Sequence, residues 1–398
     1  MSTPVYAADD AGMISTTPPP AAQTLSGVLL LSGALLALGW ANSPWASQYY
    51  ALWRLPLGST TLLHAVNDGL MALFFLMVGL EIKNEVQGGA LTSLRQAALP
   101  IVGAIGGMVV PALVYVALAR DAETLRGWGI PMATDIAFAL GIVALLRDRV
   151  PTGLRVFLAA LAIVDDIGAV LVIALFYTPE VNGVALSAMA LLTGGLLFMN
   201  TKRVQAMWPY LVGGLLLWTA VYVSGIHASI AGVLLAFTIP ARKLAGGGAP
   251  SVQHRLERGL HWPVTYLILP IFAFANAGVT LPGNLVDFAS QPAVLATAFG
   301  LVIGKPLGIT GAAWLAVRAG WAALPDGGDW PRMIGVAALG GIGFTMSLFI
   351  AALAFGDGAL LDAAKLGVLV GSLVAGSGGA LLLFSLHNKT VAQAPAGE

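Results

Sequence analysis

The chain has 398 residues, of which 58% are hydrophobic and only 10% are charged, against roughly 25% charged residues in a soluble domain. Its 19 basic and 19 acidic residues balance, so nothing in its charge suggests a nucleic-acid partner. The absence of cysteine excludes disulfides, thiolate metal sites and a cysteine nucleophile, and the composition predicts an all-α polytopic membrane protein.

The N-terminal residues 1–23 contain three consecutive prolines and no Lys or Arg, which indicates a disordered cytoplasmic leader and not a secretory signal. Apolar segments of about 20 residues then recur as far as residue 388, and a membrane span needs this length. We therefore predict a single transmembrane domain over 24–388 and a cytoplasmic tail over 389–398. The expected spans, about twelve, lie near 24–42, 62–80, 96–119, 129–146, 156–177, 184–200, 209–224, 226–239, 263–280, 292–317, 333–355 and 364–386.

The distribution of basic residues predicts the orientation, because cytoplasmic loops hold most Lys and Arg residues. With both termini in the cytoplasm, the outer side receives only Arg54, Arg120, Arg126 and Lys365, and Lys305 falls inside a span. The remaining 14 of the 19 basic residues are then cytoplasmic. An even number of spans with both termini in the cytoplasm fits this count.

The predicted outer loop 43–59 is aromatic, with Trp45, Tyr49, Tyr50 and Trp53. Such a loop is typical of an interfacial aromatic belt, and equally of a surface hairpin through which a homodimer forms. Both interpretations stay open from the sequence.

Two adjacent aspartates, Asp165 and Asp166, interrupt the apolar run LAIVDDIGAVLVIALFY at 161–177. One carboxylate at the centre of a spanning helix costs roughly 3 kcal/mol, and such residues mark ion or proton pathways. If both were ionised some 6 Å apart, at an effective dielectric near 20, they would repel each other by about 3 kcal/mol. One proton or one cation relieves that repulsion, so we interpret the pair as an ion site in preference to two structural carboxylates.

Two other predicted spans contain signs of interruption. The fourth reads PMATDIAFALG and places Thr134 and Asp135 deep in an apolar stretch after a proline. The eleventh contains Gly340, Gly341 and Gly343, which are poor helix formers, although small residues also allow close helix packing. Interrupted spans at corresponding positions of two halves indicate the midplane site of a transporter.

Lys305, in VIGKPLGI, is the only cation that the sequence places deep within a span, because Lys365 lies at the very start of the last one. A buried ammonium needs a counter-charge, and we expect Asp165 to supply it; the alternative is that the lysine snorkels to the membrane surface. Two further residues carry weaker signals. His227 is a packing residue or a proton carrier, and Asp68 lines an entrance or caps the second span.

The cytoplasmic side gathers histidines among carboxylates. A linker at 244–250, LAGGGAP, leads into a charged run. This run and the end of the second span together form either a solvated loop surface or a group of residues that responds to pH. The residues concerned are Glu81, Lys83, Glu85, His254, Glu257 and His261.

Seven stretches together resemble the NhaA-type sodium/proton antiporter family, in the expected order and across about residues 24–388. They read GLEIKNEVQGGALTSLRQAA, PMATDIAFALGIVALL, LAIVDDIGAVLVIALFYT, SGIHASIAGVLLAF, YLILPIFAFANAGV, IGKPLGI and GIGFTMSLFIAALAF. The resemblance implies twelve helices with two inverted three-helix repeats, roughly 96–177 and 292–386. It also implies that the fourth and eleventh helices are unwound and cross near the midplane.

The resemblance also implies roles for individual residues. Asp165 and Asp166 match the site for protons and for Na⁺ or Li⁺, and Lys305 matches the lysine beside it. Thr134 and Asp135 match the unwound crossing, where the carboxylate offsets the positive helix ends. Glu81, Glu85, Glu257 and His261 match a cytoplasmic pH-sensing cluster. This chain departs from the family pattern at Asn84, where a basic residue is expected, and at Arg258, where a histidine is expected. We therefore expect a pH profile that is shifted or less steep than in family members with a histidine at position 258.

The implied function is electrogenic exchange of Na⁺ or Li⁺ for protons across a bacterial inner membrane, without a cofactor and without enzymatic chemistry. A related fold that carries an organic anion with sodium is an alternative, but it would not need the aspartate pair with Lys305. An intramembrane aspartyl protease also uses two buried carboxylates, in YD and GxGD contexts. This chain has ATD and VDD and no GxGD, which disfavours the protease.

Overall fold

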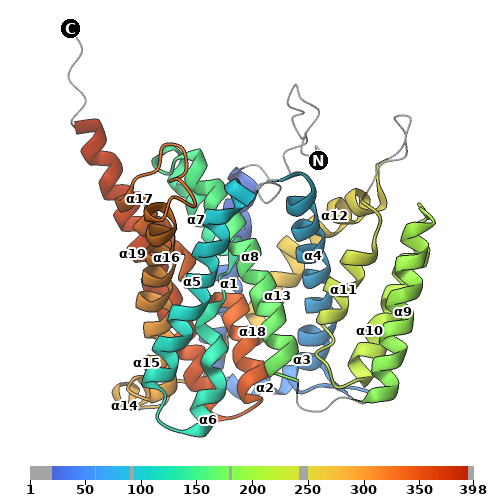
Figure 1. Cartoon of the computed structure of the whole chain (residues 1–398). Helices are drawn as coiled ribbons and strands as arrows, with labels where there is room; N and C mark the ends of the chain where they lie inside the picture. Colours follow the sequence, from blue (N-terminus) through green and yellow to red (C-terminus); the bar gives the residue numbers. More distant parts are fainter. Residues whose placement is uncertain (1–19, 59, 90–93, 179–181, 242–249, 393–398) are drawn as a thin grey trace.

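The computed structural model describes residues 20–58, 60–89, 94–178, 182–241 and 250–392. Helices make up nearly all of this part of the chain, and its one sheet pairs the two-residue strands β1 (Pro56–Leu57) and β2 (Thr60–Thr61) in antiparallel fashion. The structure confirms the predicted all-α polytopic class (Figure 1).

The helices are labelled α, and the short 3₁₀ or π-helical turns are labelled η. The first half contains α1 (Pro20–Ala41), α2 (Ala46–Trp53), α3 (Leu62–His64), η1 (Ala65–Leu70), α4 (Met71–Gly88), α5 (Leu94–Leu118), α6 (Ala122–Leu125), η2 (Arg126–Met132), α7 (Ile136–Leu146), η3 (Arg147–Arg149), α8 (Thr152–Phe176) and α9 (Gly183–Thr201). The second half contains α10 (Trp208–Val223), α11 (Ile230–Thr238), α12 (Val252–Pro263), η4 (Val264–Ile268), α13 (Leu269–Asn276), α14 (Leu285–Ala289), α15 (Pro292–Phe299), η5 (Gly300–Gly304), α16 (Lys305–Arg318), α17 (Trp330–Gly340), α18 (Phe344–Phe355) and α19 (Ala359–Ala392).

Seven helices of the described residues are long and apolar enough to cross a membrane. Two further pairs qualify when each pair is taken together, although each is bent at a short break: Ala122–Met132 (α6 with η2) and α7 by 42°, and α17 and α18 by 44°. The seven long segments are Thr24–Ala41, Leu62–Gly88, Ala97–Leu118, Thr152–Phe176, Gly183–Thr201, Pro292–Arg318 and Ala359–Leu386. The breaks fall in the two spans for which the sequence predicted an interruption.

The helix α4 lies between two apolar cores. Its residues Phe74, Phe75 and Val78 belong to the large core, whereas Leu76 and Leu80 pack with α9, α10 and α11. Figure 1 shows α9, α10 and α11 gathered at one side of the bundle, with α4 between them and α8. Any movement of one core relative to the other therefore involves α4.

The second span is longer than predicted, and the charged run after the linker is helical. The backbone of α4 continues beyond position 80 to Gly88, and α12 begins at Val252. In α12, Val252, Leu256 and Leu260 recur every four residues and bury one face. Hydropathy alone ended the spans where charges appear, but a helix continues when its charged residues face a cavity.

The aromatic loop at 43–59 packs, in its described part, within its own chain. Tyr49 is buried in α2, and its hydroxyl donates to the carbonyls of Phe274 (2.8 Å) and Ala275 (3.1 Å) at the end of α13. The Trp53 and Phe274 rings lie 5.6 Å apart. This packing gives the aromatic residues an intramolecular role, and a homodimer through this loop stays a prediction.

Several predicted segments lie partly outside the described residues. Positions 1–19 of the leader, 244–249 of the linker and 393–398 of the tail belong to this group. The described part of the tail continues α19 as helix to Ala392, beyond the predicted end of the twelfth span at 386.

Candidate ion site

The two broken helices meet at their breaks. The backbone N–H of Asp135 donates to the carbonyl of Ile342 (2.6 Å), and the Thr134 hydroxyl donates to the carbonyl of Gly340 (2.8 Å). Backbone groups at helix ends lack partners within their own helix. Each break therefore satisfies polar groups that the other one exposes, which is how irregular backbone is tolerated away from water.

Asp135 accepts hydrogen bonds from the first turns of both α7 and α18. Its Oδ1 accepts from the backbone N–H of Phe138 (3.0 Å), and its Oδ2 accepts from the backbone N–H (3.1 Å) and hydroxyl (2.5 Å) of Thr345. Helix N-termini carry partial positive charge, and one buried carboxylate lies at both of them. The charge-compensating role that the resemblance implied for Asp135 requires this position, and the role itself stays a prediction.

Lys305 is fully buried and pairs with Asp165 on α8. Its Nζ donates to Asp165 Oδ2 and to the carbonyl of Met132, the last residue of η2. The pair expected from the sequence is present, and the alternative that Lys305 snorkels to the surface is wrong because its side chain is 0% exposed. The π-helical turn η5 immediately precedes Lys305, and such turns commonly mark functional positions.

Asp166 lies beside this pair with fewer partners. It is 2% exposed, and one oxygen of Asp166 and one of Asp165 are buried without a hydrogen-bond partner. The charged groups that act on Asp166 are Asp165, Glu81, Asp135 and, with opposite sign, Lys305. Asp165, Asp166 and Lys305 together carry a net charge of −1 when all are ionised, and carboxylate oxygens of this kind suit a hard monovalent cation.

No cluster of three or more His, Cys, Asp or Glu side chains within the described ranges is placed to hold a metal ion. A cation at Asp165 and Asp166 would therefore complete its shell with hydroxyl, backbone or water oxygens. Thr134, which interacts with Asp165, offers a hydroxyl. Such a donor set fits a transported ion better than a resident metal, which needs a complete ligand cage.

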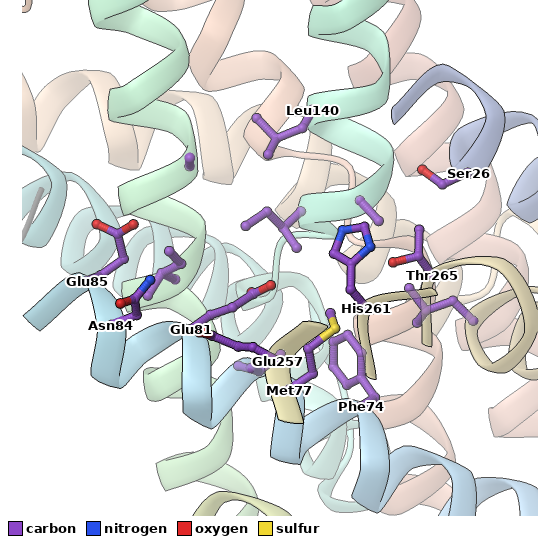
Figure 2. A pocket seen from close by; sticks show the side chains of 16 residues that line it. Ser26, Phe74, Met77, Glu81, Asn84, Glu85, Leu140, Glu257, His261 and Thr265 are labelled. Atoms are coloured by element: carbon purple, nitrogen blue, oxygen red, sulfur yellow. The ribbon is translucent and has the colours of Figure 1, made fainter. Parts of the chain in front are cut away.

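A cavity of about 160 Å³ opens beside α8, toward the end of the bundle where α4 ends and α12 begins. Figure 2 shows Glu81 of α4 and His261 of α12 directed toward the same space. Ile163, two positions before Asp165, forms part of its wall. Glu81 also acts electrostatically on Asp166, so the charges of the cavity influence the buried pair.

The cavity brings together most of the residues that the sequence analysis assigned to the cytoplasmic side. Its lining includes Glu81, Asn84, Glu85, Glu257 and His261. The interpretation of Glu81, Glu85, Glu257 and His261 as a solvated loop surface is therefore wrong, and Lys83 and His254 also lie on α4 and α12, outside the lining. Arg258 lies on the exposed side of α12 and outside the cavity lining.

Burial shifts the ionisation of the residues on α12 that precede the predicted span at 263–280. Burial raises the pKa of Glu257 from 4.5 to about 7; a hydrogen bond from Gln253 opposes this shift, and the charge of Glu85 adds to it. Burial lowers the pKa of His261. Glu257 therefore titrates near neutral pH, where a pH response requires it.

Asp68 and His227 form a second polar pair. His227 Nδ1 lies 3.5 Å from Asp68 Oδ1, and the Trp218 indole N–H donates to the Asp68 carbonyl. Asp68 lies within the π-helical turn η1, so the alternative that it caps the second span is wrong. The His227 ring meets Phe349 of α18 edge to face at 5.8 Å, which connects this pair to the broken helix.

The sequence analysis missed two hydroxyl residues of the crossing. Besides Thr345, which binds Asp135, Ser347 donates its hydroxyl to the carbonyl of Ile130 (2.6 Å). Their signal was present, since both directly follow the glycine-rich break in GIGFTMS. Hydroxyl groups after an interruption can serve backbone groups that the break exposes.

Comparison with known proteins assigns the family. A family model described as Na⁺/H⁺ antiporter 1 matches residues 20–383. A protein of Caulobacter vibrioides named Na⁺/H⁺ antiporter NhaA is 54% identical over 360 residues, which cover 90% of this chain and 87% of that protein. Proteins of the same name from Paramagnetospirillum magneticum (52% identical over 92% of this chain and 96% of that protein) and Bordetella parapertussis (51% over 91% and 94%) are similar. With this identity over nearly its whole length, the chain belongs to the Na⁺/H⁺ antiporter 1 family.

Proposed function

We propose that this protein is a sodium/proton antiporter of a bacterial inner membrane, which exports Na⁺ in exchange for protons and so maintains internal pH and sodium. The family and the names of the relatives support sodium/proton exchange. The observation that carries the mechanism is the buried pair Asp165 and Asp166, in which each residue has one oxygen without a partner beside a single lysine. The protein is a carrier and not an enzyme, and the proposed cycle needs no cofactor.

The charges of the site explain why sodium and protons compete. Two carboxylates and one ammonium leave one buried negative charge without compensation, and such a charge is costly in a site of low dielectric. One Na⁺, one Li⁺ or protons on Asp165 and Asp166 offset that charge. Because the same oxygens take either species, binding of the cation releases protons, and protonation releases the cation.

The transport cycle alternates access to this one site. Na⁺ enters from the cytoplasm through the cavity, where Glu81, Glu85 and Glu257 raise the local cation concentration. It displaces protons from Asp165 and Asp166, the protein reorients, and outside protons displace the ion. The two orientations are conformations in equilibrium, and each ligand shifts the equilibrium by its difference in affinity.

More than one proton moves per cation, so the cycle is electrogenic. The membrane potential then helps to drive sodium out, at about 2.3 kcal/mol per net charge per 100 mV. The titration of the Asp165–Lys305 pair together with Asp166 would supply more than one proton, since three ionisable groups converge there.

The proposed architecture has twelve spans with inverted repeats at 96–177 and 292–386, whose interrupted helices cross. The two bent pairs, at 42° and 44°, support it, as does the contact between their breaks. Both termini are cytoplasmic in this proposal. The distribution of basic residues supports that orientation, and Figure 1 shows α1 beginning and α19 ending at the same end of the bundle as α12. The loop 43–59 mediates the proposed homodimer.

We propose that the cavity residues form the pH-responsive cluster. Glu81, Glu85, Glu257 and His261 line one space, and the pKa of Glu257 is raised to about 7. Asn84 removes a positive charge from this cluster, and Arg258 adds one at its outer face.

The test is cation-induced collapse of a pH gradient in vesicles that contain the purified protein. Na⁺ and Li⁺ should each collapse the gradient, K⁺ should not, and empty vesicles provide the control. Clamping the membrane potential should change the rate of collapse if the exchange is electrogenic. No collapse with Na⁺ or Li⁺ at any pH from neutral to alkaline would overturn the proposal, and equal collapse with K⁺ would overturn the ion assignment.

A further inference from the structure

A second buried lysine, Lys83, lies on α4 and has no role in the exchange described above. Its side chain is outside the cavity lining, although Glu81, Asn84 and Glu85 surround it in sequence. Its Nζ donates to the carbonyls of Ala236 (3.3 Å), Phe237 (3.2 Å) and Ile239. All three carbonyls belong to the end of α11 or to the residue that follows it.

This geometry makes Lys83 a cap for another helix. The last carbonyls of a helix have no N–H partner within it and carry partial negative charge. The ion pairs found among the described residues are Lys305 with Asp165 and Arg332 with Asp329, and neither of them includes Lys83. The end of α11 is therefore the electrostatic partner of this ammonium.

The contact between α4 and α11, here called the seam, is tightly packed beside Lys83. A Cβ added at Gly79 would lie 2.6 Å from the Ala236 Cβ, and one added at Gly232 would lie 2.7 Å from the backbone nitrogen of Leu76. The two backbones are thus in direct contact along their length. Lys83 binds the end of α11 at the edge of that contact, one helical turn beyond Gly79.

The start of α12 joins the same unit. Gln253 donates its side-chain amide to the carbonyl of Leu80 (3.2 Å) on α4, and its backbone N–H to the carbonyl of Pro240 (3.4 Å) beyond α11. The ends of α4, α11 and α12 are therefore linked by polar contacts in the described part of the chain. The ionisable cavity residues all lie on α4 and α12: Glu81, Glu85, Glu257 and His261.

We infer that Lys83 is a positioning residue, which holds α4 against the end of α11 and so sets the spacing between the cavity carboxylates of α4 and those of α12. The inference deepens the proposed antiport and rests on it. At an effective dielectric of about 20, moving two carboxylates from about 5 Å to about 6 Å apart changes their repulsion by about 0.4 pKa unit. A displacement of about 1 Å at the seam therefore shifts a pH profile by about half a unit.

Three variants test this inference, each compared with the wild type in vesicles and by hydrogen–deuterium exchange. Lys83→Met keeps the length of the side chain but has no donor, and Lys83→Arg keeps the charge and the donors. Lys202→Met is the matched control, because Lys202 is exposed at the end of α9. Lys83→Met should shift the pH of half-maximal sodium/proton exchange by about half a unit and speed amide exchange at residues 236–241. Lys83→Arg should restore both, and Lys202→Met should change neither.

Three outcomes would overturn the inference. They are an unshifted pH profile in Lys83→Met, amide exchange in it as slow as in the wild type, and a shift of equal size in Lys202→Met. A shifted profile with wild-type behaviour restored by Lys83→Arg supports the inference. If Lys83→Met does not fold, Lys83→Gln replaces it under the same criteria. If the wild type itself shows no exchange, the antiport proposal has failed, and amide exchange at 236–241 alone decides whether Lys83 holds the seam.

Discussion

Removal of the charge of Lys305 should destabilise the protein strongly. The side chain is fully buried, and its Nζ donates to Asp165 Oδ2 and to the carbonyl of Met132. Truncation in Lys305→Ala would leave Asp165 and Asp166 as two buried carboxylates without a counter-charge. It would also leave the end of η2 without its donor.

The magnitude follows from these contacts. Loss of one partner of a buried ion pair costs about 3–5 kcal/mol. The lost methylenes add about 2 kcal/mol, at about 0.8 kcal/mol for each buried CH₂. Since a loss of 1 kcal/mol lowers the melting temperature by about 2–4 °C in larger domains, the variant should melt at least about 10 °C below the wild type.

The assay is thermal melting in detergent, with two further variants that separate charge from packing. Lys305→Met keeps the hydrocarbon chain and loses the charge, so it should show most of the loss. The double variant Lys305→Met with Asp165→Asn removes both charges and should recover a large part of it. An unchanged melting temperature in Lys305→Ala would refute the pairing argument. A double variant whose loss of stability equals the sum of the losses in Lys305→Met and Asp165→Asn would also refute it.

Two further predictions concern the cavity. Arg258→His introduces a group that titrates between pH 5 and 8, so it should steepen the pH profile of exchange without changing the maximal rate. The measurement is exchange activity against pH at two sodium concentrations. Curves that superimpose on those of the wild type would show that position 258 has no part in pH control. Glu257→Gln should remove a pH dependence of stability. Because burial raises the pKa of Glu257 from 4.5 to about 7, its contribution is fully present below about pH 4.5 and is lost as pH rises through about 7. Glu257 is partly exposed, so solvent screening limits the change to about 1 kcal/mol, seen as a flatter melting temperature across that window; a wild type whose melting temperature does not fall across it would contradict the reasoning.

The central residues of the site could be predicted from the sequence because their cost is visible there. A charge in an apolar run stands out, which identified Asp165, Asp166, Asp135 and Lys305. The breaks were visible through the glycine-rich stretch and through a polar pair after a proline. In the structure these residues meet at the two breaks, as the contact between Asp135 and Ile342 illustrates.

The cavity could not be predicted in the same way. Hydropathy ends a span at the first charges, so it stopped the second helix before Glu81 and left Glu257 in a loop. Both residues lie on continuous helices whose charged faces point into a shared space. The role of Lys83 was invisible for another reason. Its partners are backbone carbonyls more than 150 positions away, and a backbone acceptor has no residue type that a sequence could reveal.

Sodium/proton exchange by Asp165→Asn and by Asp166→Asn, at saturating sodium in vesicles, tests the central claim most directly. An amide can ligate a cation weakly but cannot take up and release a proton, so each variant should lose exchange completely. Each should still insert, and a cooperative thermal melt in detergent checks that the loss is not misfolding. Full exchange in either folded variant would contradict the assignment of the aspartate pair as the site where sodium and protons compete.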